Sequence, residues 1–377
     1  MKVIVNGRII TPNELLENKV LIIEQGKIIS ITDVVPDNVE IIDAKGLIIA
    51  PGFIDIHIHG SMGADVMDGT VDAIKVISAS IAQYGTTSFL PTTMTMPRED
   101  VYRSLEAIKS LQGKVLVGAE VLGAHLEGPF INEKYKGAQN AAFVIPPDYK
   151  WIKDFSDVIK VITYAPEMDS DFKFTQRIKA ETDVILSIGH SEANYELASK
   201  AIKCGCSHVT HLFNAMTGLH HRDPGIVGAA LQHDVFTELI ADTVHVNKNL
   251  FQFVLNNKGK DRIVLITDSM RAGCMKDGLY NLGEQVAYVK NGIARLADET
   301  LAGSVLTLNQ AVHNFYKNTD ATLSEAISMA SLNPATSIHV SDCKGSVEIG
   351  KDADIILLDD EFNCHLTLVK GEVVYKR

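Results

Sequence analysis

The 377-residue sequence is poor in cysteine, and its few cysteines do not suggest disulfide bonds. There are five, an odd number, at positions 204, 206, 274, 343 and 364, and they do not form the spaced even set of a disulfide framework. Cys204 and Cys206 have the spacing of a metal pair, but they end an expected helix, so we interpret them as buried thiols. Unpaired thiols are typical of a reducing compartment, and we expect a cytoplasmic protein.

Positive charge is also scarce. The chain has 35 Lys and Arg against 47 Asp and Glu, which gives a net charge of −12. This balance repels nucleic acid and anionic membrane surfaces. No run approaches the roughly 18 uninterrupted apolar residues of a membrane span, and the first residues lack a signal-peptide pattern. We therefore expect neither a nucleic-acid nor a membrane partner, and an anionic substrate would need a local basic pocket.

The chain does contain a long alternation of strand-like apolar runs and helix-length segments, which is typical of βα units around a parallel sheet. Eight parallel strands with intervening helices describe a closed (β/α)8 barrel of the TIM type. The expected strands are Phe53–His59, Thr87–Thr93, Val121–Glu127, Val158–Ala165, Val184–His190, His208–Phe213, Thr237–His245 and Arg262–Asp268.

The two ends of the chain have a different pattern. Short β-branched runs separated by turn residues fill positions 1–50, and similar runs return over 341–377. We expect both ends to form one small β-sandwich domain, with the barrel over 51–340. Helices over Ser304–Tyr316 and Leu323–Ser331 are expected to lead from the barrel to the second part of this domain.

Side chains that can bind metal recur near the C-terminal ends of the expected strands, the face where barrel enzymes place their active sites. A lone histidine is more often structural than a ligand, but a whole set at strand ends favours a metal site. Imidazole and carboxylate together suit zinc, iron or manganese better than calcium or magnesium. We expect one or two divalent ions per subunit, bound by His57, His59, Glu127, His190, His211 and Asp268.

The segment PGFIDIHIHG at residues 51–60 resembles the strand-one signature of the amidohydrolase superfamily. The segments NPA at 333–335 and GSVEIGKDAD at 345–354 are similar to its C-terminal part. Within the superfamily, HLEGPF at 125–130, THLFNAM at 210–216 and LAGS at 301–304 resemble the N-acetylglucosamine-6-phosphate deacetylases. The matches follow in order over essentially the whole chain.

The resemblance implies a role for each matching residue. Glu127, His190 and His211 would hold the tighter metal, while His57 and His59 would hold a second one together with Asp268, the catalytic base. A general base beside a metal-activated water is also consistent chemistry without the resemblance. Substrate contacts, some across a homodimer interface, would come from Asn214, Ala215, Arg222, His245, Gln139, Leu301, Ala302 and Gly303.

Two of these residues carry an open question. Many members of the family have KGAH where this chain has KGAQ at residues 136–139, which excludes a titratable role for Gln139 but leaves it able to donate a hydrogen bond to the substrate carbonyl. The planar guanidinium of Arg222 suits phosphate oxygens, although a surface salt bridge is the alternative.

The implied reaction is hydrolysis of the acetamide of N-acetylglucosamine 6-phosphate to glucosamine 6-phosphate and acetate, in amino-sugar catabolism and cell-wall sugar recycling. A cyclic amidohydrolase is an alternative, but it usually needs a carbamylated lysine at the end of strand four, and Lys160 lies inside that strand. A deaminase would share the His57 and His59 pair without explaining Glu127. A non-catalytic scaffold should have lost ligands, and none is missing.

Overall fold

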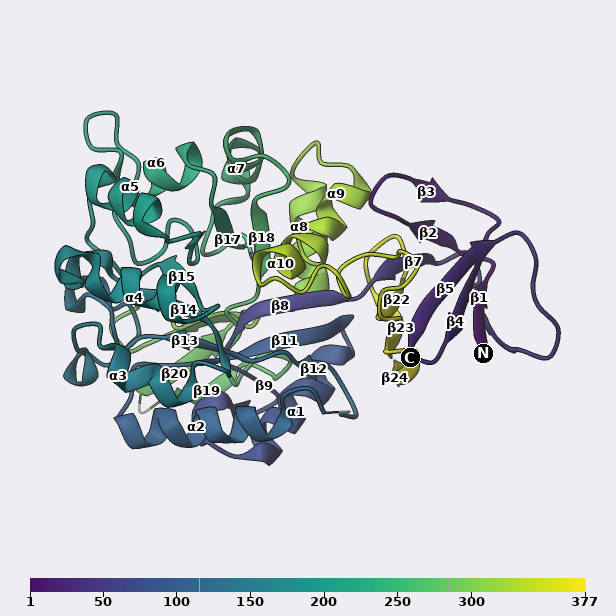
Figure 1. The fold of residues 1–377 in the computed structure, drawn as a ribbon, viewed down its shortest axis with the longest axis horizontal. Coiled ribbons are helices and arrows are strands. Elements are labelled where there is room, and N and C mark those ends of the chain that lie inside the picture. Colours follow the sequence, from purple (N-terminus) through teal and green to yellow (C-terminus); the bar gives the residue numbers. More distant parts are fainter. Residues whose placement is uncertain (115, 284) are drawn as a thin grey trace.

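Eight parallel strands surrounded by helices form a nearly closed barrel in the computed structural model, which describes residues 1–114, 116–283 and 285–377 (Figure 1). β8 pairs with β11, and a bridge between Ile58 and Ser269 joins the first strand to the segment after the last. The expected TIM-like barrel is thus confirmed. Its strands are β8 (Phe53–Ile58), β11 (Thr86–Thr93), β13 (Ala124–Glu127), β14 (Ile159–Tyr164), β15 (Ile185–Ile188), β16 (His208–Val209), β17 (Phe236–Ile240) and β18 (Ile263–Ile266), with the short β12 (Glu120–Val121) preceding β13.

These segments form barrel strands that are buried on both faces. Every residue of β8, β11, β15 and β18 is buried, as expected for parallel strands covered by helices on one side and by other barrel residues on the other. The helices are α1 (Val71–Ala82), α2 (Arg98–Leu111), α3 (Tyr149–Ile152), α4 (Lys173–Glu181), α5 (Tyr195–Cys204), α6 (Gly225–Gln232), α7 (Phe251–Lys258), α8 (Leu308–Lys317), α9 (Leu323–Ser328) and α10 (Leu332–Ser337).

The expected helix over Ser304–Tyr316 starts later than the sequence suggested, at Leu308. Ser304 does not join this helix, because its backbone N–H donates to Asp268 O and its hydroxyl donates to Thr267 O. The second expected helix, Leu323–Ser331, is α9, which ends at Ser328 and is followed by the separate α10. None of the helices in the described ranges is long and apolar enough to cross a membrane.

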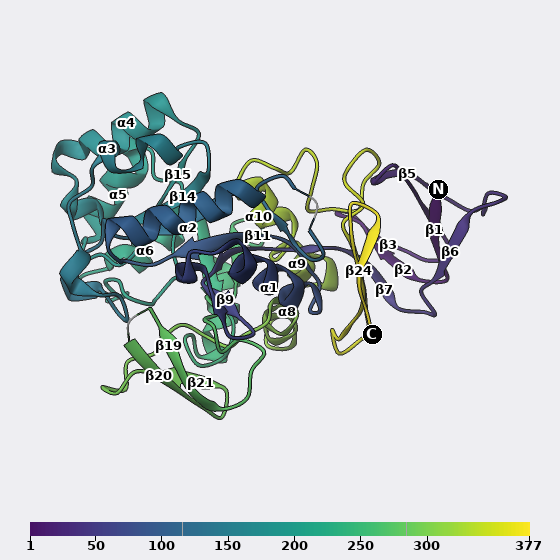
Figure 2. The ribbon, with the colours of Figure 1, turned by 90° about the horizontal axis from the view of Figure 1, so that it is seen from below.

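The chain ends build two further sheets beside the barrel, and both termini lie there (Figures 1 and 2). One sheet has the order β5-β4-β1-β6 and the other has the order β24-β23-β22-β7-β2-β3. Their strands are β1 (Lys2–Val5), β2 (Arg8–Ile10), β3 (Leu15–Leu16), β4 (Val20–Glu24), β5 (Lys27–Thr32), β6 (Glu40–Asp43), β7 (Ile48–Pro51), β22 (Ile355–Leu358), β23 (Cys364–Val369) and β24 (Glu372–Lys376).

One apolar core joins the two chain ends. Ile4, Leu21 and Ile49 from the first part pack with Ile355 and Leu368 from the last part, and β7 pairs antiparallel with β22. The expectation that both ends contribute to one small β-module is confirmed. The boundaries after residues 50 and 340 stay a prediction.

A buried lysine fastens this module to the barrel. Nζ of Lys344 lies 2.7 Å from carboxylate oxygens of Glu120 and Asp354 and 3.0 Å from Asp352. Burial alone would lower the pKa of Lys344, but the charges of Asp354 and Glu120 outweigh burial and raise the pKa well above its ordinary value. The lysine therefore neutralises acidic groups from both parts of the molecule.

A three-stranded antiparallel sheet, which the sequence analysis did not predict, follows the last barrel strand. It comprises β19 (Gly278–Leu282), β20 (Gln285–Lys290) and β21 (Ile293–Arg295) and lies along one side of the barrel (Figure 2). A small hairpin, β9 (Gly60–Ser61) and β10 (Ala64–Asp65), follows the first barrel strand. The three-stranded sheet and the segment after it bring Leu282, Thr300 and Leu301 to the barrel mouth.

Candidate active site

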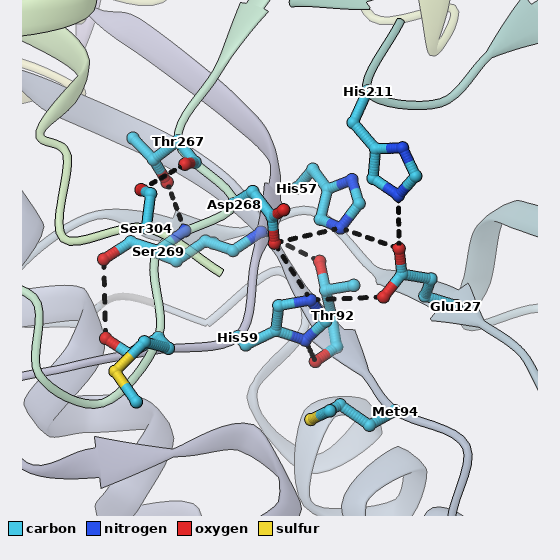
Figure 3. Close-up of polar contacts among 12 residues, drawn as sticks. His57, His59, Thr92, Met94, Glu127, His211, Thr267, Asp268, Ser269 and Ser304 are labelled. Atoms are coloured by element: carbon cyan, nitrogen blue, oxygen red, sulfur yellow. Dashed lines mark hydrogen bonds and ion pairs between the residues drawn. The ribbon is translucent and has the colours of Figure 1, made fainter. Parts of the chain in front are cut away.

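The six expected metal ligands meet at the mouth of the barrel. Figure 3 labels His57, His59, Glu127, His211 and Asp268 of this set. They lie at or just beyond the ends of β8, β13, β15, β16 and β18. His211 was expected on a strand, but β16 ends at Val209 and His211 belongs to the loop that follows it. Because the C-terminal ends of all barrel strands open on the same face, residues far apart in the sequence converge there.

The carboxylate of Glu127 lies at the centre of this cluster. Its Oε1 is 3.1 Å from Nε2 of His190 and 3.1 Å from Nε2 of His211. Its Oε2 is 3.3 Å from Nε2 of His59, and Oε1 is 3.4 Å from Nε2 of His57. Glu127 therefore stands between two pairs of imidazoles, as Figure 3 shows for His59 and His211.

Asp268 faces the histidine pair of the first strand. Its Oδ1 is 3.3 Å from Nε2 of His59 and 3.7 Å from Nε2 of His57. Its backbone N–H donates to His57 O at 2.9 Å, which ties the end of the last barrel strand to the end of the first. The carboxylate is thus held beside the two imidazoles.

Three residues of the cluster have strained backbones. His190, His211 and Asp268 have φ values of 48°, 29° and 49°, in the left-handed region that residues with a Cβ seldom adopt. Such a conformation costs about 1–3 kcal/mol and persists only where surrounding contacts enforce it, most often at functional sites. Here His190 O accepts a hydrogen bond from Asn132 N–H at 2.8 Å.

The imidazoles are oriented in the way that metal-binding histidines are. Nδ1 of His190 lies 2.8 Å from Tyr135 O, Nδ1 of His59 lies 3.1 Å from Thr92 O, and Nδ1 of His57 lies 2.9 Å from Glu238 Oε2. Each contact leaves Nε2 directed at the cluster, the arrangement expected when an outer partner fixes a ligand ring. Nε2 of His57 is buried without a hydrogen-bond partner. The donor set and this unpaired atom fit a divalent cation.

The charges of the cluster lead to the same conclusion. Burial alone would lower the pKa of His57, but the carboxylates of Glu127, Glu238 and Asp268 outweigh burial and raise it well above its ordinary value. The pKa of His59 is likewise raised, to about 9, against the effect of burial, by hydrogen bonds from its ring to Asp268 and Glu127. The pKa of Glu127 is lowered in spite of burial, chiefly by His57 and His190. The cluster therefore attracts positive charge, which a divalent ion supplies.

A cavity of about 370 Å³ opens above the cluster. Among the expected ligands, His59, Glu127, His190, His211 and Asp268 line it, while His57 is buried beneath. The expected substrate contacts that line it are Asn214, Ala215, His245, Gln139, Leu301 and Gly303.

Two expected substrate contacts lie outside this lining. Ala302 is buried behind it, where its backbone N–H donates to Ala294 O. Arg222 is exposed, with Nη1 2.7 Å from Nε2 of His221. Within one copy of the chain, the guanidinium of Arg222 does not contribute to the cavity wall.

Gln139 contacts Glu127, one of the expected metal ligands. Its Nε2 donates to Glu127 Oε2 at 2.6 Å, and its Oε1 accepts from Thr95 N–H at 2.7 Å. Both ends of the side-chain amide are therefore engaged with the protein. The expected hydrogen bond from Gln139 to a substrate carbonyl stays a prediction.

His245 brings an imidazole with a raised pKa to the cavity. Its Nδ1 lies 2.7 Å from Oδ2 of Asp242, and its backbone N–H donates to the other oxygen of that carboxylate. Burial alone would lower the pKa of His245, but the bond to Asp242 outweighs burial and raises it. The ring therefore carries positive charge at higher pH than an ordinary histidine.

Sequence reasoning missed Glu238 below this site and gave His125 no role. Glu238 of β17 contacts His57, and the signal that could have found it is a carboxylate inside an apolar strand. His125 of the HLEGPF segment is also buried, but Nδ1 lies 2.9 Å from Ile56 O and Nε2 lies 2.7 Å from Thr163 Oγ1. With both ring nitrogens engaged, and with burial lowering its pKa well below the ordinary value, His125 supports the barrel as a neutral group.

Comparison with known proteins agrees with the arrangement. Residues 48–374 match the sequence model of the amidohydrolase family. The chain belongs to the amidohydrolase family. Lys160, the lysine of strand four that was considered for the alternative of a cyclic amidohydrolase, is near the start of β14, next to Ile159, and does not line the cavity.

Similar proteins come from several bacteria. An N-acetylglucosamine-6-phosphate deacetylase of Bacillus subtilis (strain 168) is 39% identical over 97% of this chain and 95% of its own length. An N-acetylgalactosamine-6-phosphate deacetylase of Escherichia coli O157:H7 is 34% identical over 97% of both chains. The crystal structure of an N-acetylglucosamine-6-phosphate deacetylase from Pasteurella multocida superposes with a TM-score of 0.93 at 31% identity and covers 99% of both chains. The superposition on the Pasteurella multocida structure covers both the barrel and the chain-end sheets.

Proposed function

We propose that this amidohydrolase removes the acetyl group of N-acetylglucosamine 6-phosphate, releasing acetate and glucosamine 6-phosphate. The observation that carries the proposal is the placement of Glu127, with Oε1 3.1 Å from the Nε2 atoms of His190 and His211, at the base of a cavity large enough for a small substrate. The similarity to the Bacillus subtilis deacetylase over nearly the whole chain supports the same reaction.

The donor set would accommodate two ions. Glu127, His190 and His211 would hold the tighter one, and His57 and His59 with Asp268 would hold the second. Zinc, iron and manganese suit these ligands. When bound, such an ion polarises an amide carbonyl and makes a nearby water more acidic.

Asp268 would move the proton. Burial alone would raise its pKa, but the charge of His57 and the hydrogen bond from His59 outweigh burial and lower it. The group is therefore a carboxylate at neutral pH and can accept a proton from the attacking water. The same proton then passes to the amine nitrogen as the C–N bond breaks, so one side chain serves both transfers.

Recognition of the phosphate needs positive charge and N–H donors. His245, whose pKa is raised by Asp242, supplies an imidazole at the cavity wall that takes up positive charge more readily than an ordinary histidine, and Asn214 with Ala215 supplies a backbone turn that lines it. We propose that Arg222 contacts the phosphate of a substrate bound in the neighbouring subunit of a homodimer, since it is exposed and absent from the cavity of its own chain.

The five unpaired cysteines support a reducing, cytoplasmic compartment.

Arg222→Ala tests the dimer contact. Loss of uniform phosphate binding should raise KM for the phosphorylated sugar while kcat changes much less. The unphosphorylated sugar should be nearly indifferent, and sedimentation should still report a dimer. Equal losses on both sugars would assign Arg222 to structure instead.

The 4-epimer is a second candidate substrate, because the Escherichia coli relative is named as an N-acetylgalactosamine-6-phosphate deacetylase. Acetate release from both sugar phosphates, and from both sugars without phosphate, would decide between them. Higher kcat/KM for the gluco epimer supports the proposal, and higher kcat/KM for the galacto epimer corrects it. No metal-dependent acetate release from any of the four would reject deacetylation.

A further inference from the structure

Glu238 carries a carboxylate that is buried in the barrel and is not paired with a lysine or an arginine in the described residues. It lies on β17, and its exposed fraction is 0%. Its Oε2 is 2.9 Å from Nδ1 of His57 and accepts the backbone N–H of His211 at 3.2 Å, while Oε1 has no hydrogen-bond partner. Over residues 1–114, 116–283 and 285–377, neither a lysine nor an arginine forms an ion pair with it.

Such a group is expensive to keep in a barrel. A buried carboxylate loses its hydration, and an isolated one is strongly destabilising unless hydrogen bonds and opposite charge offset the loss. An apolar side chain would pack at this place on β17 without that cost, as Leu239 and Ile240 do next to it. The contacts of Glu238 are therefore the reason to look for a role at the neighbouring site.

We propose that Glu238 is a positioning residue, which fixes the ring of His57 so that Nε2 is presented as a metal ligand. This rests on the proposed metal-dependent function. An ionised carboxylate can only accept a hydrogen bond, so Nδ1 of His57 must carry the proton. When a metal ion takes the place of the second ring proton, the lone pair that it meets is that of Nε2, the buried atom without a hydrogen-bond partner that faces Glu127 and Asp268.

The second contact of Glu238 extends this role to the other half of the cluster. The same oxygen that holds His57 accepts the backbone N–H of His211, whose φ of 29° needs support from its surroundings. One carboxylate thus orients the ring of His57 on the first barrel strand and supports the backbone of His211 after the sixth barrel strand. Glu238 therefore contacts an expected ligand of each of the two ions.

No other contact of His57 in the described part of the chain duplicates this one. His125 packs against it edge to face, with ring centroids 4.5 Å apart, but both ring nitrogens of His125 are engaged elsewhere. Asp55 Oδ1 is 3.3 Å from the backbone N–H of His57 and does not touch the ring. Removal of Glu238 should therefore leave the ring free to rotate or to change its tautomer.

Metal binding by two variants tests the proposal. Glu238→Leu removes the acceptor, and Glu238→Gln keeps the size and one acceptor oxygen. Losing an outer partner of a ligating histidine typically weakens metal binding by about 10–100-fold. We expect Kd for the second ion, measured by titrating metal-free protein with Zn²⁺ or Mn²⁺, to rise by this factor in the leucine variant. In the glutamine variant Kd should rise by a smaller but measurable factor of up to about 10-fold.

The control is Glu120→Gln, which removes another buried carboxylate, the one paired with Lys344 and outside the cavity. It should lower thermal stability and leave the binding of both ions unchanged. If the glutamine and leucine variants of Glu238 melt lower but bind both ions as the wild type does, Glu238 is structural and the proposal is wrong. Should the leucine variant fail to fold, the glutamine variant decides by the same titration.

The count of ions in the wild type separates this proposal from the proposed reaction. A wild-type protein that binds a single ion and releases acetate would overturn the positioning role of Glu238 and leave the reaction intact. Two ions without acetate release, together with the expected change in Kd, would support the positioning role and reject the reaction.

Discussion

Gln139 and Glu127 share a hydrogen bond of 2.6 Å between the amide nitrogen of one and the carboxylate oxygen Oε2 of the other. The bond joins a loop residue to the carboxylate at the centre of the cluster of expected metal ligands. It also directs the remaining oxygen of Glu127 toward His190 and His211. Gln139 therefore has a role in this structure before any substrate is present.

We expect Gln139→Ala to weaken metal binding by about 10–100-fold, because an outer contact of a ligand is lost. Elemental analysis after dialysis and metal titration would measure it. Gln285→Ala is a matched control, since Gln285 donates to Ala138 O in the same loop but does not touch a ligand. Unchanged metal affinity with a lower kcat in Gln139→Ala would instead assign the amide to the substrate carbonyl.

Loss of the tighter ion and loss of the second ion should have different effects on activity. His190→Ala and Glu127→Ala should each remove the tighter ion and nearly all activity, because two remaining ligands do not hold the tetrahedral set. His57→Ala should be milder if one ion suffices, leaving one metal per subunit and substantial turnover. Metal content and acetate release on the same samples would check this. Full metal content in the His190 or Glu127 variant would contradict the assignment.

The sequence predicted the barrel well because its strands are buried on both faces. Runs such as Ile263–Ile266 are apolar throughout, and this signal does not depend on long-range contacts. The strand bounds were less accurate near the mouth. His211 and Asp268 leave the strands in a left-handed conformation that no local pattern indicates.

The sequence also indicated part of the site, namely the residues whose place on a strand can be predicted locally. The positions of His57, Glu127 and His190 at strand ends were enough to suggest a metal centre. The partners of Gln139 and Glu238 depend on which loop crosses which strand, and such contacts between distant segments are set only when the barrel closes. The sheet of β19–β21 was missed because no element had been expected between the last barrel strand and the following helix.

Asp268→Asn should separate chemistry from binding. The amide keeps the size of the carboxylate but does not accept a proton at neutral pH, so turnover should fall by about 10²–10⁴-fold or more, since one group serves both transfers. Glu127, His190 and His211 remain to hold the tighter ion. Wild-type kcat/KM should fall on the acid side as the site takes up a proton, with an apparent pKa that belongs to the coupled groups. Turnover above about a tenth of wild type, well outside that range, would require another base.

His245 and Asp242 should set the alkaline limit of phosphate binding. The pKa of His245 is raised by Asp242, so the imidazolium persists above the ordinary pH range and is lost as the pH rises through the raised pKa. KM for the phosphorylated sugar should increase there. In Asp242→Asn the increase should begin at lower pH, while KM for the unphosphorylated sugar stays flat in both proteins. The same pH dependence in variant and wild type would rule out this pair as the phosphate's cationic contact.

The pairing of β7 with β22 has a consequence for the newly made chain. β7 lies between β2, made earlier, and β22, made after the whole barrel. While the barrel is still being translated, Ile48, Ile49 and Ala50 present one open hydrogen-bonding edge, and such an edge favours pairing with other chains. Ribosome-bound chains that stop before residue 355 should therefore aggregate or bind chaperones, and release from both should follow once β22 has emerged.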